Sequence, residues 1–336
     1  MSSYEGVPVI DLDAFDRASD EGRLEVARDL TRRLEDVGFL VVVGHGIAPS
    51  AFAELRESAA RFFALDATEK DRHRPGVHGA PGYYPVAAGS LATTLGASGE
   101  PDLKESFTMG PLDRPGPEYL DATGASRWYP DDPWPEVDGM EESWSRLYRD
   151  LTRTAERVTA VFALGLDVEP EAFGHAFTRH TSTLSAIRYP PQPASAAGRL
   201  RASAHSDYGS LTLLHKEPTA DPLEILGADG SWHPVVAPEG GLVVNIGDLL
   251  ARWVNDRWVS TVHRVVAPSS PDDAPPGGSI SIGYFHQPNH DAVIAPLAAC
   301  VDAEHPLTGG TFVAGEHLAA KMARQHSTPP TPQPIG

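Results

Sequence analysis

Residues 203–216, SAHSDYGSLTLLHK, place His205 and Asp207 two positions apart, directly before an apolar, strand-like run. Alternate residues of a strand point to the same side, so these two side chains can converge on one point. A chain of this length with 14 histidines is expected to contain about one such pair by chance. The pair alone is therefore weak evidence for a metal site, and further evidence has to come from the surrounding sequence.

The surrounding sequence predicts a β-rich core with helices before it. After residue 180, short β-type segments are separated by Gly and Pro turn signals, which favours an antiparallel sandwich or barrel over a βαβ sheet. Before that point, apolar residues recur at helical spacing over 19–38, 48–65 and 139–165. We therefore expect an α+β fold in which helices surround a jelly-roll core.

The chain is expected to form one integrated domain, with no internal repeat. Residues 73–135 are rich in Gly, Pro and aromatic residues and are expected to form ordered loop. Three regions are expected along the chain: an N-terminal helical and loop region (1–175), the β core (176–300), and a C-terminal helix and tail (301–336).

Composition narrows the range of partners. The formal net charge of −19 argues against nucleic acid or an anionic membrane surface, because both require a basic patch. No apolar run approaches the roughly 20 residues of a membrane helix, and no signal peptide is visible. The single cysteine, Cys300, fits a reducing compartment. We expect a cytoplasmic protein with a small-molecule substrate; its oligomeric state stays open.

A third metal ligand has to come from a strand that is distant in sequence. His263 lies near the end of a predicted strand, in WVSTVHRVV. Two histidines and one carboxylate on one face of a metal leave positions open for other ligands. That arrangement is the facial triad of non-haem Fe(II) oxygenases.

Seven stretches together carry a resemblance to a known family. They are VPVIDLDAF (7–15), GFLVVVGHGI (38–47), KESFTMG (104–110), IRYPPQP (187–193), HSDYGSLTLL (205–214), LVVNIGDLLARWVNDRWVSTVHRVV (242–266) and SISIGYF (279–285). In content and order they resemble the isopenicillin N synthase-like branch of the 2-oxoglutarate/Fe(II)-dependent dioxygenase superfamily. The likeness covers nearly the whole chain. It implies a double-stranded β-helix in which His205, Asp207 and His263 bind Fe(II), with 2-oxoglutarate and O₂ as co-substrates.

The chain departs from the family pattern at one position. The family has an arginine, one residue and then a serine, which bind the far carboxylate of 2-oxoglutarate. Here Ser281 keeps the serine, but Ser279 stands at the arginine position. A carboxylate buried without a cationic partner costs several kcal/mol. Either another cation takes that role, or the co-substrate is not a conventional 2-oxoglutarate.

Two other residues are candidates for this carboxylate. The resemblance implies Tyr189 as a hydrogen-bond donor. Lys216 shares the parity of positions 212 and 214, so it could enter the pocket from a core strand and supply the missing charge. A solvent-exposed lysine at a strand end is the alternative for Lys216.

The leading hypothesis is an Fe(II)- and 2-oxoglutarate-dependent oxygenase that hydroxylates, desaturates or cyclises a small metabolite. One alternative is an oxidase of the isopenicillin N synthase type, which uses O₂ without 2-oxoglutarate. Another is a non-catalytic jelly-roll protein that binds a ligand. The residues expected to contact substrate are Tyr83, Lys104, Phe107 and Phe285. Loop or core packing is the alternative for Tyr83 and Phe107, and a solvated side chain for Lys104.

Overall fold

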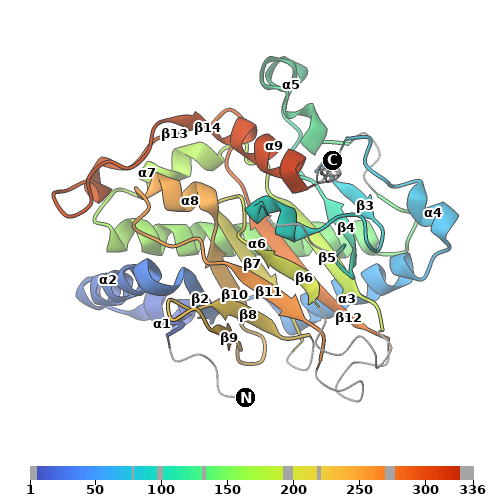
Figure 1. The fold of residues 1–336 in the computed structure, drawn as a ribbon, viewed down its shortest axis with the longest axis horizontal. Coiled ribbons are helices and arrows are strands. Elements are labelled where there is room, and N and C mark those ends of the chain that lie inside the picture. Colours follow the sequence, from blue (N-terminus) through green and yellow to red (C-terminus); the bar gives the residue numbers. More distant parts are fainter. Residues whose placement is uncertain are drawn as a thin grey trace, which may run out of the picture.

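The computed structural model describes residues 6–77, 79–96, 101–130, 134–191, 200–217, 221–268 and 277–325. Its core consists of two sheets (Figure 1). Side chains from both sheets line one shared pocket. The larger sheet contains β1 (Val9–Asp11), β2 (Phe39–Val43), β3 (Gly82–Tyr84), β4 (Glu105–Met109), β5 (Thr183–Tyr189), β7 (Leu211–His215), β10 (Leu242–Ile246) and β12 (Ser279–His286). The smaller sheet contains β6 (Leu200–His205), β8 (Leu223–Leu226), β9 (Trp232–Pro234) and β11 (His263–Val266).

Both sheets have the crossed strand order of a jelly roll. The larger sheet runs β1-β2-β10-β7-β12-β5-β4-β3, and the smaller runs β6-β11-β8-β9. The pairings described within these two sheets are antiparallel, apart from that of β1 with β2. The expected α+β fold with a double-stranded β-helix core is confirmed.

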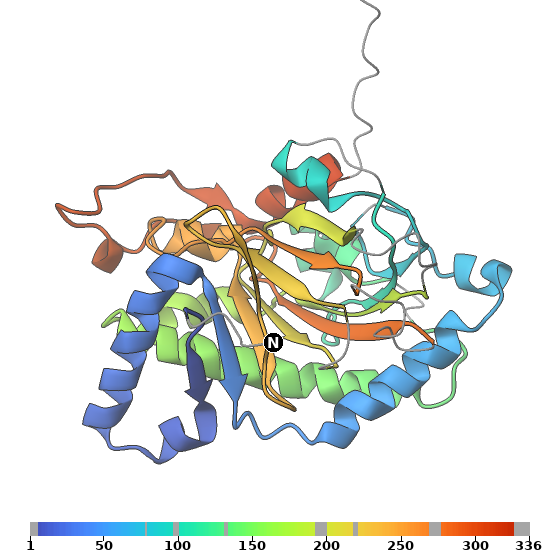
Figure 2. The ribbon, with the colours of Figure 1, turned by 60° about the horizontal axis from the view of Figure 1, so that its bottom comes forward.

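Helices cover the outer face of the larger sheet. The long α6 (Met140–Gly165) runs along this face, with α2 (Asp20–Val37) and α3 (Pro49–Phe63) packed beside it (Figure 2). The apolar stripe of α6 faces the core, where Trp144 and Leu147 are fully buried. Burying one such side chain stabilises the fold by about 1.5–3 kcal/mol. These are the helices that the periodicity predicts.

Alternation along β7 separates the packed core from the pocket. Leu211 and Leu213 belong to the helix-covered core, whereas Thr212 and Leu214 line the pocket between the sheets. Successive strand residues point to opposite faces, so one strand serves both layers. The strand ends at His215, one residue before Lys216.

The region expected to be loop contains regular structure. Residues 73–135 include β3, β4, the short helix α5 (Pro117–Thr123) and the 3₁₀ helices η1 (Leu91–Leu95) and η2 (Ala125–Trp128). Of the two strands, β4 alternates fully between buried and less buried residues, but it has only five residues and lies between Gly- and Pro-rich segments. Strands from both sides of residue 175 therefore share the larger sheet, while the three-region division stays a prediction.

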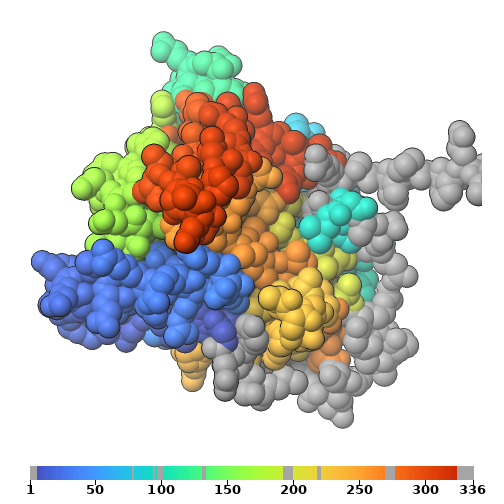
Figure 3. Space-filling model, turned by 60° about the vertical axis from the view of Figure 1, so that its left-hand side comes forward, coloured from blue at the N-terminus to red at the C-terminus, as the bar shows by residue number. Residues whose placement is uncertain are grey.

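The remaining elements complete the surface. They are α1 (Leu12–Arg17), α4 (Ala67–Asp71), α7 (Glu171–Gly174), η3 (His175–Phe177), α8 (Asp248–Trp253), β13 (Val293–Ile294), η6 (Ala298–Cys300), β14 (Phe312–Val313) and α9 (Ala314–Gln325). In Figure 3 the blue N-terminal segment and the red C-terminal segment form neighbouring parts of one face. The expected tail beyond residue 325 lies outside the described residues. Among the helices described, none is both long and apolar enough to span a membrane.

Candidate active site

Three side chains at one end of the smaller sheet meet at one point in the pocket. His205 ends β6, His263 begins β11, and the two are direct partners in the β6–β11 register. Asp207 lies in the turn that follows β6. Its Oδ1 is 3.7 Å from Nε2 of His205 and 3.8 Å from Nε2 of His263. One ligand atom from each residue lies within 4.8 Å of the other two, as a shared metal requires.

Close packing of glycines fixes the turn that carries Asp207. A Cβ on Gly247 would lie 2.3 Å from the carbonyl oxygen of Gly209, which excludes any side chain at that position. The amide of Asp248 donates to the carbonyl of Asp207 at 2.7 Å. Gly247 and the first residue of α8 thus hold the Asp207 turn through backbone contacts.

Backbone carbonyls orient both imidazoles. Nδ1 of His205 bonds to the carbonyl oxygen of Ser203 at 2.7 Å, and Nδ1 of His263 to that of Thr261 at 3.0 Å. A carbonyl only accepts, so each Nδ1 carries the hydrogen and each Nε2 keeps its lone pair for a metal. Burial, with the neighbouring His263, lowers the pKa of His205 to about 3, which leaves this ring neutral at neutral pH.

Two polar side chains hold the carboxylate of Asp207. Its Oδ2 accepts hydrogen bonds from Nδ2 of Asn245 at 2.7 Å and from Oγ1 of Thr212. Oδ1 is left directed at the two imidazoles. With the non-ligating atoms of all three residues hydrogen-bonded, two neutral imidazoles and one carboxylate oxygen form a donor set that fits Fe(II).

Asn245→Leu is expected to weaken Fe(II) binding about 10- to 100-fold, the usual cost of losing a group that orients a metal ligand. Asn245 contacts Asp207 but is not itself a ligand, so the three ligands remain in the variant. Anaerobic equilibrium dialysis with Fe(II) measures the change. Unaltered affinity would show that Thr212 alone suffices to orient the carboxylate.

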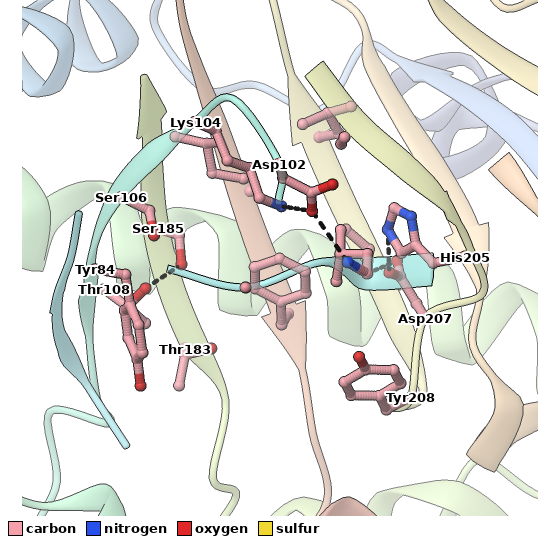
Figure 4. Close-up of a pocket in the computed structure, with 18 of the residues that line it drawn as sticks. Tyr84, Asp102, Lys104, Ser106, Thr108, Thr183, Ser185, His205, Asp207 and Tyr208 are labelled. Atoms are coloured by element: carbon pink, nitrogen blue, oxygen red, sulfur yellow. Dashed lines mark hydrogen bonds and ion pairs between the residues drawn. The ribbon is translucent and has the colours of Figure 1, made fainter. Parts of the chain in front are cut away.

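The pocket in front of this triad has a polar wall. Ser106 and Thr108 of β4, with Thr183 and Ser185 of β5, line it from the larger sheet (Figure 4). The hydroxyls of Thr108 and Ser185 lie 2.7 Å apart. Apolar residues complete the lining, among them Leu91, Trp128, Leu214, Leu223, Val265 and Met322.

Side chains alternate between the two faces of a strand, and this alternation determines which of the residues expected at the site face the pocket. Tyr189, Lys104 and Phe285 line it, as expected of residues that contact the co-substrate or the substrate. Their roles toward these ligands stay predictions.

The prediction that Tyr83 and Phe107 contact substrate is wrong, because both side chains are buried in the core, at 4% and 1% exposure. The hydroxyl of Tyr83 donates to buried Glu105, and the ring of Phe107 packs against Trp144. Successive strand residues point to opposite faces, so their chain neighbours face the pocket instead. These neighbours are Tyr84, Ser106 and Thr108.

Apart from Tyr189, the residues expected to hold the far carboxylate do not line the described pocket. Within the part of the chain that the structure describes, Ser279, Ser281 and Lys216 are not among the lining side chains. The hydroxyl of Ser279 donates to Asp221, a buried carboxylate. The prediction that Ser279 binds the co-substrate is therefore wrong, because its hydroxyl hydrogen is already donated to Asp221.

Asp221 belongs to a buried ion pair that the sequence did not reveal. Nε of Arg201 lies 2.7 Å from Oδ1 of Asp221, and both side chains are only 2% exposed. Another nitrogen of Arg201 donates to the carbonyl of Pro190 at 2.6 Å. A negative charge thus lies beside Ser279, where the resemblance implied a positive one.

Gln287 is a further pocket residue that sequence reasoning missed. It is 7% exposed, lines the pocket, and its Oε1 is buried with no hydrogen-bond partner in the described structure. Buried acceptors are seldom left unpaired. Gln287 follows Gly283 and Phe285 of β12 at intervals of two residues, and all three line the pocket. This two-residue spacing is the sequence signal that could have revealed it.

Comparison with known proteins identifies the class. Residues 7–136 match the model of the non-haem dioxygenase N-terminal domain, described from morphine synthesis, and residues 178–288 match the 2OG-Fe(II) oxygenase superfamily. Validamycin A dioxygenase of Streptomyces hygroscopicus subsp. limoneus is 33% identical, over 94% of this chain and 85% of its own length. A homoarginine-6-hydroxylase of Oryza sativa subsp. japonica is 31% identical, over 96% and 98%.

Solved structures agree with this assignment. A full-length Neurospora crassa protein in complex with alpha-KG (2-oxoglutarate) superposes with a TM-score of 0.80 at 27% identity, covering 96% of this chain and 98% of that one. A 2OG-Fe(II) oxygenase family protein from Caulobacter crescentus gives 0.79 at 30% identity, covering 96% and 99%.

The chain belongs to the 2-oxoglutarate/Fe(II)-dependent oxygenase superfamily, in its isopenicillin N synthase-like branch. It is an Fe(II) dioxygenase whose co-substrates are 2-oxoglutarate and O₂. Relatives named as 2-oxoglutarate-dependent enzymes disfavour the oxidase that dispenses with 2-oxoglutarate. The same Neurospora crassa protein is also solved with the small molecules thymine and 5-formyluracil.

Proposed function

We propose that His205, Asp207 and His263 hold the Fe(II) with which this chain oxidises a small, polar metabolite. The observation that carries the proposal is the convergence of the three ligand atoms within 4.8 Å. The hydrogen bonds on both Nδ1 atoms and on Oδ2 of Asp207 leave only the metal-facing lone pairs free. Bound Fe(II) with 2-oxoglutarate would supply the oxidising chemistry toward an unactivated carbon.

The chain's own residues would bind and orient the reactants. The deep end of the pocket, with Tyr189, would take the co-substrate. The wall of Thr183, Ser185 and Thr108 would hydrogen-bond the substrate, and the ring of Phe285 would pack against it. The apolar remainder of the lining would exclude water.

A polar substrate is supported by the composition of this wall. Four hydroxyl-bearing residues and Gln287 offer both donors and acceptors around the open side of the triad. Validamycin A, homoarginine and thymine, which are named for three relatives at 26–33% identity, each carry several hydrogen-bonding groups. A substrate without such groups would leave these side chains unpaired.

The test is coupled turnover with a panel of candidate substrates. Purified protein with Fe(II), O₂ and 2-oxoglutarate is incubated with each of the three named compounds and with apolar metabolites of similar size. We expect a polar compound to raise succinate formation and to gain oxygen or lose hydrogen, as seen by mass spectrometry. Stimulation by apolar compounds alone would contradict the proposal.

Gln287→Leu is expected to raise the KM for the stimulating polar substrate about 5- to 150-fold, because a buried substrate donor loses its acceptor. Gln287→Glu keeps an acceptor of the same length and is expected to restore much of the affinity. Steady-state kinetics on the three proteins measure this. An unchanged KM in Gln287→Leu would remove Gln287 from the substrate site.

A further inference from the structure

The far carboxylate of 2-oxoglutarate needs a cation, and the pocket offers one. 2-Oxoglutarate carries a 2-oxo acid group, which binds the metal, and a second carboxylate at the other end of its carbon chain. That second carboxylate is buried once the ligand enters the pocket, and an unpaired buried charge is costly. Of the described residues that line the pocket, only Lys104 is a lysine or arginine.

Lys104 lies at the same end of the pocket as Tyr189. It immediately precedes β4, and Glu105 is the register partner of Arg188 on β5. Extending that antiparallel register by one residue places Lys104 opposite Tyr189. Figure 4 shows its side chain beside Asp102, on the wall that leads to the triad.

The N–H groups of the Lys104 ammonium are available to donate hydrogen bonds to a ligand. Its nearest ion-pair partner, Oδ2 of Asp102, is 3.9 Å away, which is beyond hydrogen-bond distance. The two oxygens of Asp102 already accept from the backbone amides of Ser203 at 2.9 Å and Leu91 at 3.1 Å. Asp102 therefore positions the lysine by charge without using its hydrogens. The side chain of Lys104 is 22% exposed, and Lys104 is one of the residues that line the pocket.

The other nearby cations are already bound or face elsewhere. Arg201 pairs with Asp221, and Arg188 pairs with Glu105 at 2.6 Å. A second carboxylate beside Ser279 would also meet the negative charge of Asp221. Lys216 follows the end of β7 and does not line the described pocket.

We infer that Lys104 binds the metal-remote carboxylate of 2-oxoglutarate, with Tyr189 beside it and Asp102 as its positioning residue. This inference rests on the proposed function. It moves the anchor from the β12 position marked by Ser279 to the start of β4, on the other side of Tyr189.

The test compares two ligands that differ only at the remote group. 2-Oxopentanoate has a methyl group where 2-oxoglutarate has the far carboxylate. Binding of each is titrated anaerobically to the Fe(II) protein through the visible charge-transfer band, so that no turnover is involved. Lys104→Met is expected to weaken 2-oxoglutarate about 30-fold or more while leaving 2-oxopentanoate nearly unchanged.

Lys216→Met is the matched control, with the same substitution at a lysine outside the pocket. We expect it to leave both affinities within about twofold, a change of about 0.4 kcal/mol. Selective loss of 2-oxoglutarate binding in Lys216→Met but not in Lys104→Met would overturn the inference and return the role to Lys216. Equal weakening of both ligands by Lys104→Met would also overturn it, because the lysine would then act at the metal end.

Two further measurements keep the inference separable from folding and from the proposed function. If Lys104→Met does not fold, Lys104→Gln tests the same loss of charge, and crystals of the unmodified protein with 2-oxoglutarate show directly whether Nζ contacts the remote carboxylate. Absence of that contact would contradict the inference. Failure of the unmodified protein to bind Fe(II) would instead reject the proposed function.

Discussion

Asp207→Ala is expected to lose Fe(II) affinity by more than about 100-fold and to lose 2-oxoglutarate turnover with it. Substitutions of groups that merely orient a ligand cost about 10- to 100-fold, so removal of a ligand costs more. Asp207 is the one anionic member of the triad, and its Oδ1 is the atom that faces both imidazoles. Metal content after anaerobic loading and succinate formation are the two measurements.

Asp229→Ala serves as the control for this substitution. Asp229 lies in an exposed turn between β8 and β9, away from the pocket, and pairs with His233. It changes the net charge by the same amount as Asp207→Ala. We expect full iron loading in the control. Equal iron loading in Asp207→Ala would remove this carboxylate from the metal site.

Arg201→Met is expected to lower the free energy of unfolding by about 3–5 kcal/mol, because it leaves the carboxylate of Asp221 buried without its partner. Both side chains are 2% exposed, so water cannot replace the guanidinium. The hydroxyl of Ser279 still donates to Asp221, but one neutral hydrogen bond does not neutralise a buried charge. Urea denaturation followed by circular dichroism measures the loss.

Two comparisons isolate the buried charge as the cause. Adding Asp221→Asn to Arg201→Met removes the orphaned charge and is expected to recover most of the stability. Arg264→Met breaks a more exposed pair with Glu224, 26% and 21% exposed, and is expected to cost about 0–1 kcal/mol. A cost for Arg201→Met no larger than that for Arg264→Met would refute the explanation.

The triad could be predicted because the positions of its residues follow from short spacings in the sequence at the ends of strands. His205 and Asp207 follow the two-residue period at the end of a strand, and His263 stands at a strand end opposite. The acceptors that fix the imidazoles could not be predicted. Each is the carbonyl two residues earlier, at Ser203 and Thr261, and that contact depends on backbone conformation rather than on residue type.

The pocket lining was harder to predict because short strands carry little periodic signal. Thr212 and Leu214 line the pocket although they lie an odd number of positions from Asp207, because the turn between β6 and β7 shifts the two-residue period by one. The strand β7 then ends at His215, before the pattern reaches Lys216. In β3, which has three residues, the sequence offers no reason to prefer Tyr84 over Tyr83.

The ion pair of Arg201 and Asp221 has no sequence signature either. Twenty positions separate the two residues, and nothing in their neighbourhood marks them as partners. Their pairing follows from the packing of the two sheets, which brings β6 and the start of β8 to the same end of the barrel as β12.

Anomalous diffraction at the iron absorption edge, from crystals grown anaerobically with Fe(II), tests the central claim most directly. We expect one anomalous peak, at coordination distance from Nε2 of His205, Nε2 of His263 and Oδ1 of Asp207 together. An iron peak bound elsewhere, or bound by fewer than these three atoms, would contradict the assignment of this site.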